Sequence, residues 1–166
     1  TASHGSHIFL SASPMCLNNP PRPVRLSSLL FGVVLVACTE RASPEPIDVV
    51  EASIEGVQQA ILVGETTCRM VVQAHLDRIE AYEDRINAIT VLNPNALVRA
   101  DSIDAAVSVS EQLGVLFCVP MLVKDNFDTH DMVTTGGSIA LRESIPPDDA
   151  FMVRRIREEG AIVIAK

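Results

Sequence analysis

The sequence contains two lysines, and one of them, Lys124, is the first candidate for chemistry. It follows eight apolar residues, 116–123 (LFCVPMLV), and precedes Asp125 and Asn126. An apolar run of this length, bounded by turn residues, is typical of a strand that is buried on both faces. A lysine at the end of such a strand has two open interpretations. It reaches solvent as an ordinary cation, or it lies in a dry pocket, where burial lowers an ammonium pKa and makes a base available near neutral pH.

Other groups near this run give no sign of a metal or a cofactor. Asp128, His130 and Asp131 are residue types that bind metals, but three polar residues within four positions of a turn are usually solvated. No Gly-rich phosphate loop with Lys-Ser/Thr is present, and residues 135–138 (TGGS) do not form a GxGxxG motif. We therefore predict neither a metal site nor a cofactor.

The cysteines are Cys16, Cys38, Cys68 and Cys118, and they form no CxxC pair and have no zinc-ligand spacing. Cys68 and Cys118 lie among apolar residues, where the simplest interpretation is two small buried hydrophobic side chains. A disulfide between them is the alternative, and it would require an oxidising compartment.

The N-terminal region is predicted to direct export. Residues 15–38 contain Arg22 and Arg25, then an apolar segment at 26–36 and the small residue Ala37, which is the layout of a secretory signal. The apolar segment is shorter than the roughly 20 residues that span a bilayer. We therefore expect an exported bacterial protein, in the periplasm or the cell envelope.

The end of this predicted signal suggests how the protein is attached to a membrane. Residues 35–38 (LVAC) resemble a bacterial lipobox, in which Cys38 would be lipidated and would anchor the protein to a membrane. Simple cleavage before Cys38 is the alternative. Residues 1–14, before Met15, are interpreted as an upstream extension or a scar, and the polar, Pro-containing residues 39–46 as a tether.

The elements that must position Lys124 lie in residues 47–166, which are predicted to form an α/β domain. Apolar residues spaced i, i+3, i+4 predict a helix from Ser53 to Gly64 and a second one capped by Thr66 or Thr67. His75 lies on the apolar stripe of the second helix and is interpreted as a packing residue. The remaining elements are a strand at 86–92, a helix from Asn93-Pro94 to about 113, the strand at 116–123, a turn at 134–138, a helix from Asp148 or Asp149 to Gly160, and a strand at 161–165.

Strands alternating with helices favour a sheet with crossover connections. Because a parallel sheet needs both faces covered, and the last strand stops at Lys166, we expect the chain to be part of a larger domain. The charge, 21 acidic against 13 basic residues, argues against nucleic acid as a partner, since phosphate binding needs clustered Lys and Arg.

Several blocks in this region, in order, resemble the amidase signature family. They are 119–126 (VPMLVKDN), 134–138 (TTGGS), 146–151 (PPDDAF) and 160–166 (GAIVIAK), with shorter blocks upstream at 65–67, 78–79, 87–88 and 93–97. The resemblance covers nearly all of residues 47–166. It implies a mixed sheet packed between helices, and the hydrolysis of a small-molecule amide without a cofactor.

The resemblance also implies a Ser–cis-Ser–Lys mechanism, in which a serine attacks the amide and a second serine relays its proton to a neutral lysine. Lys124 matches that lysine, in agreement with the dry-pocket interpretation. The family's Gly/Ser-rich segment with both serines follows the region equivalent to residue 166, and Ser138 and Ser144 do not match it. The present chain is therefore expected to be inactive alone, with Lys124 exposed. No residue is assigned to substrate binding.

Two residues depart from the family pattern. Cys118 replaces a glycine before Val-Pro, and Asp131 replaces a glycine in the following turn, where a left-handed backbone would suit it poorly. Two other functions stay open: a lipoprotein module that has lost catalysis, and an amidotransferase subunit that generates glutaminyl-tRNA. The export signal disfavours the second, because that chemistry is cytoplasmic.

Overall fold

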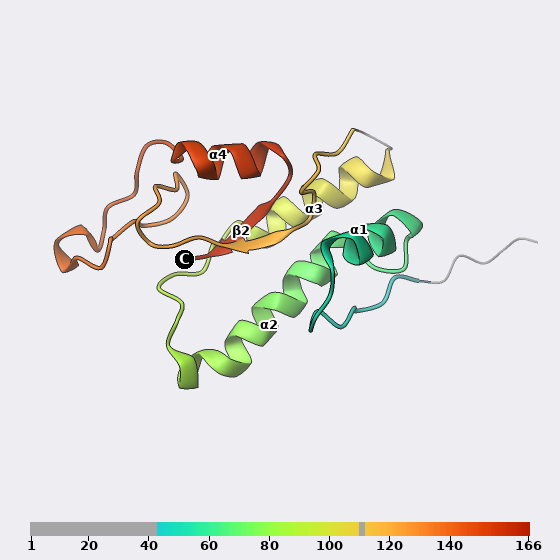
Figure 1. The fold of residues 1–166 in the computed structure, drawn as a ribbon, viewed down its shortest axis with the longest axis horizontal. Coiled ribbons are helices and arrows are strands. Elements are labelled where there is room, and N and C mark those ends of the chain that lie inside the picture. The colour runs from blue at the N-terminus through green and yellow to red at the C-terminus, as the bar shows by residue number, and fades with distance from the viewer. Residues whose placement is uncertain (1–42, 110–111) are drawn as a thin grey trace, which may run out of the picture. The chain divides into compact units, whose positions relative to one another are not determined.

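The computed structural model describes residues 43–109 and 112–166. Its elements along the chain are α1 (Ile54–Val63), α2 (Cys68–Ile86), α3 (Ala96–Ser108), β1 (Pro120–Leu122), the short 3₁₀ helix η1 (Ile139–Leu141), α4 (Phe151–Glu158) and β2 (Ile162–Ala165) (Figure 1). The predicted α/β class is confirmed. The predictions for residues 1–38 fall outside the described residues.

Local capping explains where the first two helices begin and end. The Ser53 side chain accepts a hydrogen bond from Gly56 N at the start of α1, and Gly64 ends that helix at φ 81°. Thr67 caps α2 in the same way. These boundaries agree with the sequence prediction. A further carboxylate from α3, Asp104, accepts hydrogen bonds from the Cys68 and Arg69 amides at 2.7 and 3.0 Å, which ties α2 to α3.

The sheet is small and centres on β2. β1 and β2 run parallel, with Pro120 opposite Ile162 and Met121 opposite Val163. On the other side of β2, Leu92 forms an antiparallel bridge with Ala165. Among the described residues, β1 therefore has a strand neighbour on one side only.

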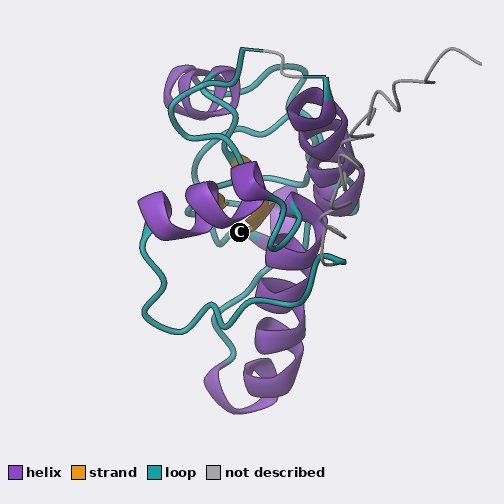
Figure 2. Cartoon of the chain, turned by 90° about the vertical axis from the view of Figure 1, so that its right-hand side faces the viewer, coloured by secondary structure: helices purple, strands orange, loops and turns teal. Residues whose placement is uncertain are grey.

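Both faces of β2 are buried, each against a different set of helices. Ile162 and Ile164 belong to a core cluster with residues of α1, α2 and α3, whereas Val163 packs with Val153 of α4 and with Met132. Figures 1 and 2 show the strands between these helices. The sheet is thus covered on both sides, as the apolar sequence of β2 requires.

Several predicted elements are shorter than the sequence suggested. The strand at 86–92 is wrong for most of its length, because α2 continues to Ile86 and Asn87 ends it in a left-handed conformation, which leaves only the bridge at Leu92. The helix predicted to reach residue 113 is α3, which ends at Ser108. Asp148 and Asp149 do not cap α4; Ala150 is its N-cap, because the Asp149 carboxylate bonds to His130 instead.

The strand predicted at 116–123 is reduced to β1, because turns occupy residues 115–118. This segment lies against the end of α4: Leu116 N donates to Glu159 O at 2.9 Å, and Cys118 N donates to Gly160 O at 3.1 Å. A Cβ on Gly160, whose φ is +88°, would lie 2.8 Å from Phe117 Cα. The close approach of two backbones therefore replaces strand pairing here.

Cys68 and Cys118 form a disulfide, which corrects their interpretation as separate buried hydrophobic side chains. Their Cα atoms lie 5.5 Å apart, and both residues are buried. The bond joins the first residue of α2 to the residue two before β1. Cys118 has φ +57°, a conformation that glycine adopts without strain, so the family's glycine is replaced at a position that favours it.

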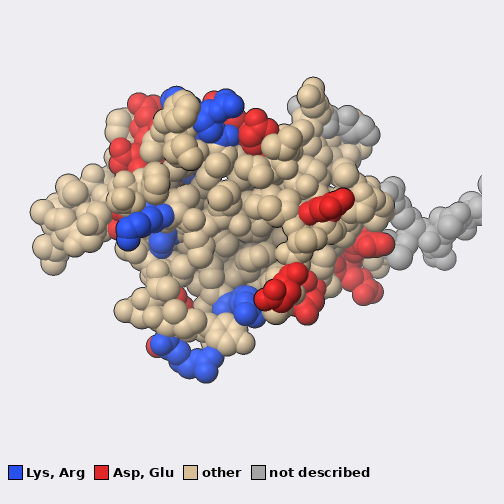
Figure 3. All heavy atoms as spheres, viewed as in Figure 1, with Lys and Arg blue, Asp and Glu red and all other residues tan. Residues whose placement is uncertain are grey.

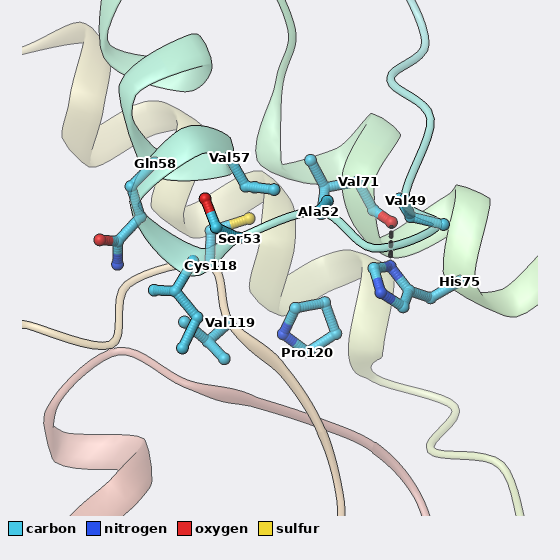
Figure 4. A pocket seen from close by; sticks show the side chains of 11 residues that line it. Val49, Ala52, Ser53, Val57, Gln58, Val71, His75, Cys118, Val119 and Pro120 are labelled. Carbon is cyan, nitrogen blue, oxygen red and sulfur yellow. Dashed lines mark hydrogen bonds between the residues drawn. The ribbon is translucent and has the colours of Figure 1, made fainter.

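The disulfide borders a pocket of about 160 Å³ between α1, α2 and the approach to β1. Figure 4 shows Cys118, Val119 and Pro120 on one side of it and the side chains of α1 and α2 on the other. His75 lies at its edge with Nδ1 2.8 Å from Val71 O, a bond within α2. The packing role interpreted for His75 from the sequence stays a prediction.

The face in Figure 3 carries its charged side chains around the rim, and the middle of the face has none. Cations and anions are interspersed on α4, where Glu158 pairs with Arg155 at 2.6 Å and with Arg154 at 4.0 Å. In the part of the chain that the structure describes, no helix is both long enough and apolar enough to cross a membrane.

Candidate functional site

Two lysines leave the sheet at the same edge. Lys124 follows β1 and Lys166 follows β2, and because the two strands are parallel their carboxyl ends lie side by side. This edge is where ligands bind in open α/β sheets. The two lysines nevertheless have opposite environments, and the contrast defines the site.

Lys124 is exposed, and in the described residues its ammonium has no hydrogen-bond or ion-pair partner. It lines an open pocket of about 270 Å³ together with Thr90, Asp125, Asn126 and residues 135–137. The exposure agrees with what was expected for the chain without the family's serine segment. The Lys124 side chain is therefore accessible to any group that is brought over this pocket.

Asp125 connects Lys124 to the Thr-Gly-Gly turn. Its carboxylate accepts hydrogen bonds from the Thr135 amide, at 3.1 Å, and from the Thr135 hydroxyl. The Gly136 amide donates to Asp125 O at 2.8 Å, and the Gly137 amide donates to Thr135 Oγ1 at 3.1 Å. The amides of this turn therefore already donate to Asp125 and to Thr135, so they hold the turn's shape and offer no oxyanion hole.

Lys166 is the buried lysine, with a side chain that is 0% exposed. Its Nζ donates to Thr129 Oγ1 at 3.2 Å, Val133 O at 3.0 Å and Thr134 Oγ1 at 2.5 Å, and lies 3.5 Å from Asp125 Oδ1. Burial lowers the pKa of Lys166 below its usual value, against the opposing effect of Asp125.

The pKa of Asp125 lies below its ordinary value, although burial alone would raise it. Hydrogen bonds from the Thr135 side chain and backbone, followed by the charge of Lys166, outweigh the burial. Asp125 is thus an ionised carboxylate at neutral pH, held between the turn and the buried lysine. The sequence prediction missed Lys166, although its signal was present: a second apolar strand that ends in lysine, as the first one does.

The candidate metal ligands belong to an ion-pair cluster beside this site. Asp131 accepts two hydrogen bonds from Arg157, at 2.7 and 3.0 Å, and Asp149 pairs with His130 at 2.8 Å. Ligand atoms of His130, Asp131 and Asp149 lie within 4.8 Å of one another, but Arg157 already supplies the positive charge there. Asp128 is not part of the group.

Asp131 does not have the left-handed backbone that was expected to strain it, since the positive-φ residues other than glycine in the described residues are Glu51, Asn87 and Cys118. Its carboxylate also accepts from Asn93 Nδ2 at 3.0 Å. Burial raises the pKa of Asp131, but the hydrogen bonds and charge of Arg157 outweigh this and leave the pKa below its usual range. The replacement of glycine by Asp131 thus adds a partly buried ion pair.

Comparison with known proteins shows which family has a similar sequence around Lys124. A family model described as Amidase matches residues 70–166. One subunit of the glutamyl-tRNA(Gln) amidotransferase of Bdellovibrio bacteriovorus is 34% identical over 120 residues, covering 72% of this chain and 24% of that protein. Its counterpart in Salinispora arenicola is 41% identical over 117 residues, covering 69% and 24%.

Solved structures show the same similarity. The native peptide amidase from Stenotrophomonas maltophilia superimposes with a TM-score of 0.67 at 37% identity, over 70% of this chain and 24% of that one. An amidase family protein from Bacillus anthracis gives a TM-score of 0.66 at 32% identity, over 71% and 24%. The chain thus spans about a quarter of the length of these relatives.

Proposed function

Because the chain belongs to the amidase signature family, we propose that the whole protein is an exported amide-bond hydrolase with Lys124 as its base. The observation that carries the proposal is the position of Lys124. It stands in an open pocket at the carboxyl edge of the sheet, beside a turn whose shape is fixed by Asp125.

The chemistry follows from the family's triad. A serine attacks the amide carbonyl, a second serine passes the proton on, and Lys124 accepts it as a neutral amine. Both serines and the oxyanion-binding amides belong to the family segment that follows the matched region. When that segment covers the pocket of Lys124, it excludes water, and a drier environment favours the neutral amine.

Export distinguishes the proposed amide hydrolase from the alternative function, an amidotransferase subunit that generates glutaminyl-tRNA. The signal-like residues 15–38 support export, and so does the Cys68–Cys118 disulfide, since such bonds persist in oxidising compartments and are rare in the cytosol. The similarity to the amidotransferases favours that second function. However, glutaminyl-tRNA synthesis is cytoplasmic, and the disulfide favours the exported amidase.

Amide hydrolysis by the full reading frame tests the proposal. The probes are an amidated dipeptide and a simple aliphatic carboxamide, with release of ammonia as the readout. We expect turnover that falls by at least about 10³-fold in Lys124→Ala, because the proton acceptor is lost. Arg142→Ala is the matched control: it removes an exposed cation, 70% accessible, from the same part of the domain.

The outcomes separate the candidate functions. Residues 1–166 alone are expected to be inactive, because they supply the base without the nucleophile. Turnover that survives Lys124→Ala would refute the role of Lys124. Inactivity of the full reading frame towards both amides, with activity towards glutamyl-tRNA, would favour the amidotransferase, and inactivity towards all three a binding module.

A further inference from the structure

Lys166 is a buried cation for which the triad provides no role. A charge without solvent is costly unless it is paired and hydrogen-bonded. Lys166 uses all three of its N–H donors on Thr129, Val133 and Thr134. A methionine or leucine at the end of β2 would avoid this cost, so the question is what the charge does.

All the partners of the Lys166 ammonium lie in one segment, residues 125–134. This segment begins directly after Lys124 and leads to the Thr-Gly-Gly turn that lines the same pocket. The Lys166 ammonium therefore holds both ends of the segment against the end of β2. It forms an ion pair with Asp125, 3.5 Å away, at the start of the segment, and it donates a hydrogen bond to Thr134 at its end. The Lys166 side chain thus contacts the segment both next to Lys124 and next to the Thr-Gly-Gly turn.

The charge of Lys166 also bears on its neighbours. The carboxylates that act on it are Asp125, Asp128 and Asp131, and of these Asp131 is already neutralised by Arg157. Asp125 is the residue next to Lys124. Without Lys166, its negative charge would act on the Lys124 ammonium and stabilise the protonated form, which cannot accept a proton.

We propose that Lys166 is a positioning residue for the base: it holds the 125–134 segment against β2 and offsets the charge of Asp125, so that Lys124 is presented as a neutral amine. This inference rests on the proposed amide hydrolysis, although its structural half can be tested without activity.

The first test is the pH profile of kcat/KM of the full reading frame, which reports the free enzyme's essential groups. In Lys166→Met, the acid limb is expected to move to higher pH. The expected shift is a few tenths of a pH unit, the order that Coulomb's law gives for one unit charge acting on a nearby exposed group in water. Asp125→Asn is expected to move the limb to lower pH, and the double variant to bring it back towards the wild-type position.

A purely structural role for Lys166 would lower kcat/KM at every pH and leave the limb in place, and this result would overturn the proposal. Where Lys166→Met does not fold, Asp125→Asn decides alone: a limb that stays in place or moves to higher pH refutes the inference.

The second test is hydrogen exchange, which does not depend on activity. In Lys166→Met, the amides of Thr135 and Gly136 are expected to exchange at least about 10-fold faster, while the amides of α1 keep their wild-type rates. Unchanged exchange at Thr135 and Gly136 would refute the positioning role. Faster exchange in a protein that hydrolyses no amide would instead leave the positioning intact and refute only the proposed function.

Discussion

Removing the Cys68–Cys118 disulfide is expected to cost about 4 kcal/mol of folding free energy. The two cysteines are separated by 50 residues. In the chain-entropy model, opening a loop of that length returns about 14 cal/mol/K to the unfolded state, which is about 4 kcal/mol at 25 °C. A domain of this size is stabilised by only about 5–15 kcal/mol in total, so the bond is a large part of its stability.

The positive φ of Cys118 gives the prediction a second component. An L residue in the left-handed region costs about 1 kcal/mol that glycine avoids. Cys68→Ala should therefore lose about 4 kcal/mol, whereas Cys68→Ala combined with Cys118→Gly should lose about 3 kcal/mol. The glycine that the family has at this position is thus expected to recover part of the loss.

Urea unfolding of the oxidised chain, followed by circular dichroism, measures these differences. With an m value of about 2 kcal/mol/M, Cys68→Ala should lower the midpoint by about 2 M, and the added Cys118→Gly should raise it again by about 0.5 M. Thiol titration of the native wild type should detect neither Cys68 nor Cys118. Equal midpoints for the wild type with and without reductant, or thiol labelling of Cys68 or Cys118 in the folded chain, would refute the reasoning.

Three further predictions concern other parts of the chain. The free energy of unfolding should fall as the pH drops below about 4, because the pKa of Asp131 is lower in the folded chain than in the unfolded one. The stability that Asp131 contributes is fully present above its pKa in the unfolded chain and is lost as the folded carboxylate is protonated. Asp131→Asn should flatten this pH dependence and cost about 2 kcal/mol at pH 7, measured by urea unfolding. Gly160→Ala should destabilise the fold by more than Gly136→Ala, which should cost about 1 kcal/mol. Both glycines have a positive φ, but only a Cβ at Gly160 would meet the Phe117 backbone. Equal thermal midpoints for the two variants would contradict this prediction. Cys38→Ala should release the protein from membranes, and unchanged fractionation would favour simple cleavage.

Local chemistry is what the sequence predicted best. Ser53, Gly64 and Thr67 mark the helix ends because a cap depends on residues within one turn of it. The β2 segment was predicted because four consecutive apolar residues suit a strand with two buried faces. The position of Lys124 at the sheet edge was predictable for the same reason, because it directly follows an apolar run.

Properties that depend on distant segments were missed. β1 is short because residues 115–118 turn to meet Glu159 and Gly160, which the apolar run alone cannot indicate. The burial of Lys166 depends on Thr129 and Thr134, more than 30 residues earlier. The disulfide requires a left-handed turn at Cys118 that directs its sulfur towards α2, and nothing adjacent in sequence signals that turn.

The central place of β2 has a consequence for the order of events during synthesis. Ile162 and Ile164 complete one core cluster and Val163 the other, and all four residues of the strand are buried. Neither cluster can close before these residues have left the ribosome, although α1, α2 and α3 precede them by more than 50 residues. The two core clusters thus stay incomplete until that moment, which would suit the export proposed above, because a secretion channel threads an unfolded chain.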